Sequence, residues 1–180
     1  MNEVEFMNEP APLAGNALEL GDKAAVCTLA APDLSEIRVG KSERVQIIMS
    51  APSLDMPGCA DELRKFDQLT AGLRNTEAIV VSMDLPFAAE KFRASNGIKN
   101  LRFASDFRAK DFARSYGMLI GGGALAGLCA KALFIIDSLG VTVYKQVVSE
   151  VQSEPDFEAM MDLARIISRN SCSNLSLIHI

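Results

Sequence analysis

The chain has 180 residues, which is enough for one domain with a sizeable core but short for two. Hydrophobic residues make up 49% of it and charged residues 23%, and this excludes a mainly disordered or fibrous chain. The formal net charge is -5 and no block of basic residues occurs, so nucleic acid is not expected as a partner.

Targeting and membrane signals are absent from the sequence. The first 22 residues contain five acidic side chains and no Lys or Arg, the reverse of the basic start of a secretory signal. The longest uncharged run near the middle, residues 115–130, is rich in glycine and too short to span a membrane. We therefore expect a cytoplasmic protein without a membrane partner, in a reducing compartment where thiols stay free.

The small number of histidines and cysteines in the sequence limits the kinds of metal site and thiol chemistry that it can support. The one histidine, His179, lies in an uncharged stretch, residues 171–180, that we expect to form a disordered tail outside a single domain of residues 1–170. The cysteines are widely spaced and form no Cys-x-x-Cys pair; they are Cys27, Cys59, Cys129 and Cys172. We expect no metal and no cofactor, and any reactive thiol has to act alone or with a distant partner.

Apolar runs and turn residues predict strands that alternate with helices, an α/β sheet. The first 22 residues, with Pro10 and Pro12, are expected to be loop-like. Strands are predicted at 24–30, 45–49, 78–83 and 101–104, with helices at 59–73, 86–94 and 109–116. Near the end, a tight connection at Ser138-Leu139 predicts an antiparallel hairpin of strands 131–137 and 140–148, followed by a helix over 155–169.

The helix predicted from Cys59 follows a turn rich in Pro and Gly, residues 51–58. Its apolar positions recur every three or four residues: Cys59, Leu63, Phe66, Leu69 and Leu73. The charged residues are assigned to the exposed face: Asp61, Glu62, Arg64, Lys65 and Asp67. The Cys59 sulfur would then lie among unpaired N–H groups at the helix start, which predicts a thiolate with a lowered pKa. The alternative is a small buried hydrophobe that begins the apolar face.

The stretch from Pro52 to Ala60, Pro-Ser-Leu-Asp-Met-Pro-Gly-Cys-Ala, is followed by Arg64-Lys65-Phe66. It resembles the active-site segment of the atypical two-cysteine thiol peroxidase branch of the peroxiredoxin family, which has Pro-Ser-x-Asp-Thr-x-x-Cys. The likeness continues in order from Val4 to about Arg165, through the segments at 82–88, 105–108, 116–117, 127–128, 135–137 and 153–157. The resemblance implies a thioredoxin-like, peroxiredoxin-type mixed sheet flanked by helices, and a homodimer.

The resemblance also implies a mechanism. Cys59 would attack a peroxide and become a sulfenic acid, and Pro52 would form part of the pocket. Two supporting positions depart from the family pattern. Met56 stands where the family has Thr and lacks the hydroxyl, leaving only a weak sulfur acceptor. Lys131 stands where the family has Arg, so electrostatic support remains without the planar fork of donors.

A third departure concerns the resolving cysteine, because Arg93 occupies the position that usually carries it. Cys129 is a possible substitute: if residues 129–131 are extended, it shares the face of Lys131. Plain packing is the alternative for Cys129, and Cys27 is expected in the core. The resemblance then implies a one-cysteine enzyme recycled by thioredoxin or another external thiol reductant.

Three functions remain open from the sequence. The first is a thiol-dependent peroxidase that reduces hydrogen peroxide or organic hydroperoxides through Cys59. The second is a catalytically weakened or inactive peroxiredoxin-like dimer that acts as a redox sensor or binding module, favoured by Met56, Lys131 and Arg93. The third is a nucleotide- or metal-binding α/β domain, which no Walker A sequence supports. The sequence favours the first function.

Overall fold

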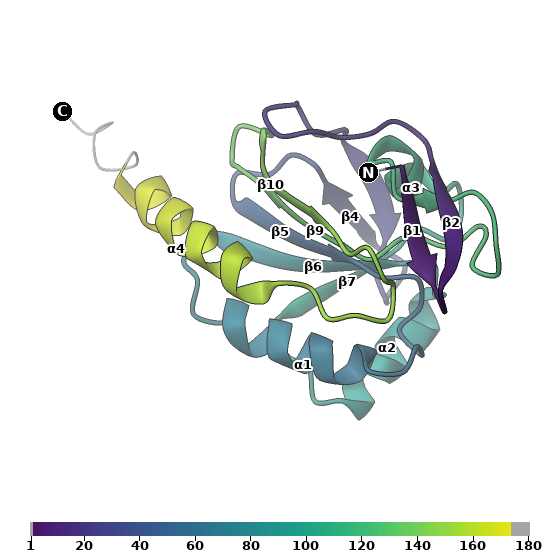
Figure 1. Cartoon of the computed structure of the whole chain (residues 1–180). Coiled ribbons are helices and arrows are strands. Elements are labelled where there is room, and N and C mark those ends of the chain that lie inside the picture. Colours follow the sequence, from purple (N-terminus) through teal and green to yellow (C-terminus); the bar gives the residue numbers. More distant parts are fainter. Residues whose placement is uncertain (1, 174–180) are drawn as a thin grey trace.

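The structure is a computed structural model that describes residues 2–173. Within these residues, seven strands form one mixed sheet in the order β10-β9-β5-β6-β7-β3-β4, and a smaller sheet has the order β1-β2-β8 (Figure 1). The elements, in chain order, are β1 (Glu3–Phe6), β2 (Glu9–Ala14), β3 (Cys27–Ala30), β4 (Glu36–Val39), β5 (Val45–Ser50), α1 (Cys59–Thr70), β6 (Thr76–Ser82), α2 (Pro86–Ser95), β7 (Leu101–Ser105), α3 (Asp111–Ser115), β8 (Leu119–Ile120), β9 (Ala132–Ile136), β10 (Thr142–Val147) and α4 (Phe157–Ser173).

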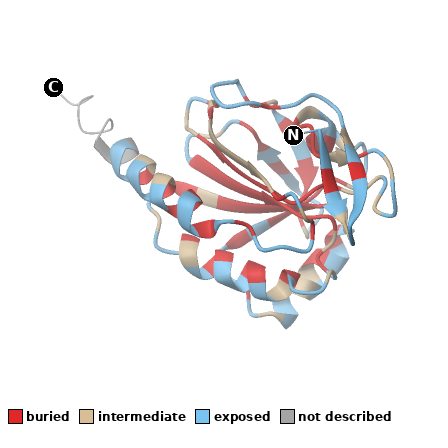
Figure 2. Ribbon diagram, viewed as in Figure 1, coloured by how far each residue is buried: buried red, intermediate tan, exposed pale blue. Residues whose placement is uncertain are grey.

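Three parallel strands, β5, β6 and β7, form the middle of the large sheet, and α1 and α2 connect them. Their residues are almost all buried, which explains why the sequence shows continuous apolar runs there (Figure 2). The predicted hairpin near the end is confirmed: β9 pairs antiparallel with both β10 and β5. The expected mixed sheet flanked by helices is therefore present.

Each face of the large sheet carries its own hydrophobic core, because side chains alternate between the faces along every strand. Helices α1, α2 and α4 cover one face, and their apolar residues pack against Ile47, Met49 and Ile135. On the other face, α3 and the small sheet pack against Ile48 and Phe134. Helix α1, which begins at Cys59, therefore belongs to the first of these cores.

The loop-like start predicted for the first 22 residues is wrong for Glu3–Ala14, which form the antiparallel hairpin β1–β2. Met7 and Asn8 both have positive φ, 53° and 64°, as a tight two-residue hairpin turn requires. The two prolines of β2 face Glu5 and Glu3 of β1 in a sheet of only three strands. Strand β2 lies in the middle of this sheet but pairs with β8 only at Leu13 and Ala14, so the prolines lie outside that ladder. Proline, which lacks an N–H donor, is tolerated at such unpaired edges and was a poor indicator of a loop here.

The exposed face predicted for the helix at Cys59 is wrong at two positions. Glu62 and Asp67 are buried. The Asp67 carboxylate accepts backbone N–H bonds from Asn100 at 2.7 Å and Leu101 at 3.1 Å, so it anchors the segment that leads into β7. From the sequence alone, a buried carboxylate with such partners cannot be distinguished from a charged residue on a solvent-exposed helix face.

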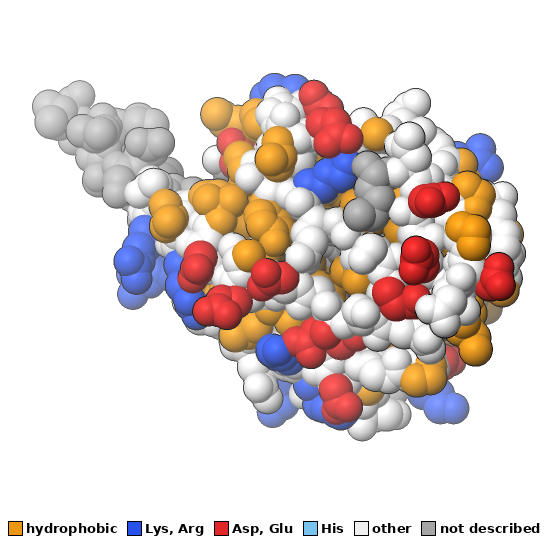
Figure 3. All heavy atoms as spheres, in the orientation of Figure 1, with side chains coloured by type: hydrophobic (Ala, Val, Ile, Leu, Met, Phe, Trp, Pro, Cys, Tyr) orange, Lys and Arg blue, Asp and Glu red, His pale blue; other side chains and the backbone are white. Residues whose placement is uncertain are grey.

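Several boundaries also differ from the sequence-based expectation. Strands β4 and β8 were not predicted, and α1 ends at Thr70 rather than at Leu73. Helix α4 continues to Ser173, so residues 171–173 extend it, while the rest of the predicted tail lies outside the described residues. On the face shown in Figure 3, acidic side chains spread over the region of the β1–β2 hairpin, in keeping with the net charge of -5.

Candidate active site

The loop between β5 and α1 is held in place by one carboxylate, Asp84, which follows β6. Its two oxygens accept hydrogen bonds from the Ser53 hydroxyl at 3.0 Å and from the Leu54 backbone N–H at 2.8 Å. Pro52, the predicted pocket residue, is buried in the same loop. Because β5 and β6 are adjacent parallel strands, their C-terminal ends bring this loop and Asp84 together.

Cys59 is the first residue of α1, as predicted. Gly58 precedes it with φ 84°, a left-handed conformation that glycine adopts without strain, and the Cys59 N–H donates to the Met56 carbonyl at 3.1 Å. The side chain points into the core between α1 and the sheet, and Cys59 is only 2% exposed. The thiol therefore lies at a helix N-terminus but out of contact with bulk water.

Lys131, just before β9, is buried and reaches the first turn of α1. Its Nζ donates to Glu62 Oε1 at 2.9 Å and to the Ser153 carbonyl at 3.0 Å. The exposed side-chain fractions of Lys131 and Glu62 are 5% and 7%. The second carboxylate oxygen, Glu62 Oε2, is buried without a hydrogen-bond partner. Such a pair is well shielded from solvent, and each charge depends on the other to offset its desolvation.

These surroundings reverse the sequence-based prediction of a lowered Cys59 pKa. Burial, which has the largest effect, and the Glu62 carboxylate together raise the pKa of Cys59 to about 12, and among the largest contributions only Lys131 opposes them. Burial also raises the pKa of Glu62, although its bond with Lys131 acts in the opposite direction. In this conformation the Cys59 thiol is protonated, because desolvation outweighs the effect of the helix N-terminus.

Glu62 is a buried residue of this site that sequence reasoning missed. It lies three residues after Cys59 in a run of charged residues, which is typical of a solvated helix face. Nothing in its spacing distinguishes it from Asp61, which is exposed and pairs with Arg64. What distinguishes Glu62 from Asp61 is its ion pair with Lys131, and that pair is visible only in the three-dimensional structure.

Met56 lies in the loop and is partly buried, packed against both cores. It lines a pocket of about 480 Å³ that reaches from this loop across the first turn of α1, at Ala60, to Phe92 of α2. Met56 and Ala60, on either side of Cys59 in the chain, line this pocket, but Cys59 itself does not.

The structure does not bring the other thiols to Cys59. Cys129 and Cys27 are free and buried in the core on the opposite face of the sheet. Cys129 packs in that opposite core, whereas the Lys131 side chain reaches Glu62 of α1, so Cys129 does not share the face of Lys131. At the position of the usual resolving cysteine, Arg93 is paired with Glu90 at 2.6 Å. Cys172 lies outside the residues whose side chains are described.

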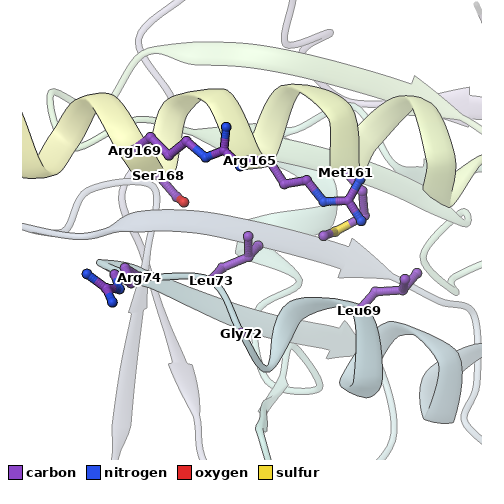
Figure 4. Close-up of a pocket in the computed structure, with 8 residues that line it drawn as sticks. All are labelled: Leu69, Gly72, Leu73, Arg74, Met161, Arg165, Ser168 and Arg169. Carbon is purple, nitrogen blue, oxygen red and sulfur yellow. The ribbon is translucent and has the colours of Figure 1, made fainter.

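A larger groove of about 540 Å³ lies elsewhere, between the end of α1 and α4 (Figure 4). Leu73 and Met161 point toward its centre. The groove is flanked by Arg74, which follows α1, and by Arg165 and Arg169 of α4. None of the predicted site residues lines it. Within residues 2–173, no cluster of three or more His, Cys, Asp or Glu side chains could hold a metal ion. No helix in that range is long and apolar enough to cross a membrane.

Comparison with known proteins places the chain in a family. The family model described as Redoxin matches residues 19–161. The thiol peroxidase of Campylobacter jejuni is 48% identical over 156 residues, which cover 87% of this chain and 89% of that protein. The thiol peroxidase of Aquifex aeolicus is 42% identical over 160 residues, which cover 88% and 94%.

Solved structures agree with these relationships. A peroxiredoxin-like protein from Aquifex aeolicus superposes with a TM-score of 0.89 at 40% identity, covering 93% of this chain and 98% of that one. A thiol peroxidase from Chromobacterium violaceum has a TM-score of 0.83 at 22% identity over the same shares and supports the fold alone. The fold and the cysteine that begins α1 define a peroxiredoxin-type, thioredoxin-like protein. The chain belongs to the Redoxin family and is a thiol peroxidase of the peroxiredoxin type.

Proposed function

We propose that Cys59 reduces hydrogen peroxide or an organic hydroperoxide. The Cys59 thiolate attacks the terminal peroxide oxygen, the O–O bond breaks, and an S–O bond forms. Cys59 becomes a sulfenic acid, and the alcohol or water leaves after taking up one proton. Lys131 supports the negative charge on sulfur, and the loop that contains Pro52 and Met56 forms one wall of the approach.

The observation that carries this proposal is the convergence of Cys59 and Lys131 in one buried site. The cysteine begins a helix, and the chain holds a buried ammonium group beside that first turn. A cation near the cysteine is the only large contribution that lowers its pKa. The pocket of about 480 Å³ beside Met56 has room for a small peroxide. Relatives named thiol peroxidase, at 42–48% identity, support the same activity.

Among the thiols that the structure describes, none besides Cys59 lies in its core, so we propose that the sulfenic acid reacts with a thiol from another molecule. Neither Cys27 nor Cys129 lies in the core that contains Cys59, and Arg93 replaces the usual resolving cysteine. We propose thioredoxin or another small-molecule or protein thiol as the reductant. A homodimer and a cytoplasmic location, both expected from the sequence, remain predictions that size-exclusion chromatography and cell fractionation test.

Peroxide consumption with and without a reductant tests the function. With dithiothreitol or thioredoxin present, the protein is expected to consume many equivalents of hydrogen peroxide. Without a reductant, each chain is expected to consume about one equivalent rapidly and then stop at the sulfenic acid. Peroxide loss no faster than that caused by the reductant alone would contradict the proposal. The same protein with Cys59 alkylated beforehand is the matched control.

Restoring the two altered side chains is expected to accelerate the reaction. In a variant that combines Met56→Thr with Lys131→Arg, the hydroxyl offers a hydrogen bond to sulfur, and the guanidinium has donors to spare beyond Glu62. One added hydrogen bond to a charged group contributes about 1.5–3 kcal/mol, which corresponds to a rate gain of roughly 10-fold to 150-fold. The measurement is the second-order rate constant with hydrogen peroxide.

The matched control for this pair combines Met56→Val with Lys131→Arg, because valine has the shape of threonine without the hydroxyl. It is expected to gain less than the threonine variant. Equal rates for the threonine variant and the unmodified protein would show that the missing hydroxyl and fork do not limit this site.

A further inference from the structure

Glu62 lies in the same helical turn as Cys59, and its free oxygen, Oε2, accepts no hydrogen bond from the Cys59 thiol in the resting structure. The two residues are three apart in the first turn of α1, a spacing that places their Cβ atoms about 5–6 Å apart on one side of the helix. The carboxylate folds back toward the start of the helix: Oε1 lies 4.0 Å from where a Cβ on Gly58 would be. Both residues are buried, so no bulk water separates them.

The hydrogen bonds around Glu62 leave one oxygen available. Lys131 occupies Oε1, while Oε2 is buried and accepts no hydrogen bond from any described residue. A buried, unpaired carboxylate oxygen is costly, so it calls for a physical explanation, and a catalytic role is one. As an unpaired carboxylate oxygen, Glu62 Oε2 can accept the proton that the Cys59 thiol has to lose.

Few charged groups act on Cys59 and Glu62. Asp55 and Asp84 of the neighbouring loops act on Cys59, and both disfavour the thiolate. Glu154, close to the Ser153 carbonyl that holds Lys131, acts on Glu62 and favours its protonated form. Lys131 is the only cation among the groups that act appreciably on either residue. A proton that moves from Cys59 to Glu62 leaves the net charge of the cluster unchanged.

We propose that Glu62 accepts the Cys59 proton when the thiolate forms and returns it to the leaving oxygen. This inference rests on the proposed peroxidase function and deepens it. Cys59–SH and Glu62–COO⁻ become Cys59–S⁻ and Glu62–COOH, and Lys131 then faces the thiolate. The sulfur bonds to the terminal peroxide oxygen, which keeps its own hydrogen. The O–O bond breaks, the leaving RO⁻ takes the proton from Glu62, and Glu62 returns to the carboxylate that pairs with Lys131.

The pH dependence of Cys59 oxidation tests this inference. Because the proton stays inside the cluster, the rate constant with hydrogen peroxide is expected to change less than about twofold between pH 7 and pH 9. An isolated thiol with a high pKa reacts about tenfold faster for each pH unit over this range. A tenfold rise per unit in the unmodified protein overturns the inference but leaves the peroxidase function intact. No oxidation of Cys59 at any pH overturns the function itself.

The variant Glu62→Gln keeps the size of the side chain and removes its ability to hold the proton. Its oxidation rate is expected to rise about tenfold per pH unit, because the proton then has to leave to solvent. A flat profile in this variant overturns the inference, since a step other than proton transfer would limit both proteins. The control is Asp61→Asn, which removes an exposed charge from the same helix turn and is expected to keep the flat profile.

Folding of the glutamine variant is checked by near-UV circular dichroism and by its unfolding midpoint. If the glutamine variant does not fold, the pH profile of the unmodified protein tests the inference by itself. A flat profile supports the inference, and a tenfold rise per pH unit overturns it.

Discussion

Cys59→Ser is expected to abolish peroxide reduction, lowering the rate by at least about a thousandfold. A serine hydroxyl stays protonated near neutral pH and is a poor nucleophile toward the O–O bond, so no sulfenic acid equivalent forms. Oxygen and sulfur differ little in size, and the residue is only 2% exposed, so the start of α1 is expected to persist. Initial rates of hydrogen peroxide loss with excess dithiothreitol measure the effect.

Two further cysteine variants serve as controls for this prediction. Cys27→Ala and Cys129→Ala remove thiols from the core on the opposite face of the sheet and are expected to keep the rate within about twofold, provided that both remain folded. If turnover survived in Cys59→Ser but disappeared in Cys129→Ala, the reactive thiol would be Cys129, on the opposite face of the sheet. That result would contradict the mechanism.

Lys131→Met is expected to destabilise the fold by about 3–5 kcal/mol near neutral pH, because it leaves the Glu62 carboxylate buried without its partner. Urea unfolding of the variant and the unmodified protein measures the difference. In the variant the pKa of Glu62 rises further above its unfolded value, since burial acts without Lys131. The folded state then binds more protons than the unfolded state, so the stability of the variant falls as pH rises. The deficit is therefore expected to be larger at pH 8 than at pH 5.

Removing both charges together is the control for this stability effect. A variant with Glu62→Leu and Lys131→Met leaves no uncompensated charge and is expected to recover most of the lost stability. A double variant as unstable as the single one would show that Lys131 contributes mainly through the packing of its methylene groups.

Much of the fold could be predicted from local patterns, because each central element carries a strong signal of its own. The apolar run of β5, the Pro-Gly turn after it and the periodic apolar positions of α1 correctly indicated a strand, a turn and a helix that begins at Cys59. The hairpin β1–β2 was missed because Pro10 and Pro12 were taken as breakers, although a small sheet accommodates them.

The site was only half predictable, for a physical reason. The position of Cys59 at a helix start follows from sequence, but its pKa depends on how far the surrounding core desolvates it, which no local pattern reveals. Glu62 was assigned to the solvent face because its sequence neighbours are charged. Its partner Lys131 is 69 residues away in the chain, and only the sheet brings them together.

The reactivity of Cys59 is tested most directly by site-resolved oxidation of the reduced protein. The protein is exposed briefly to one equivalent of hydrogen peroxide with a dimedone-type trap, and each cysteine is quantified by peptide mass spectrometry. We predict rapid sulfenic acid formation at Cys59 while Cys27 and Cys129, whose pKa values are also raised by burial, stay reduced. Oxidation of Cys59 no faster than that of an ordinary thiol would contradict its role as the peroxide-reducing residue.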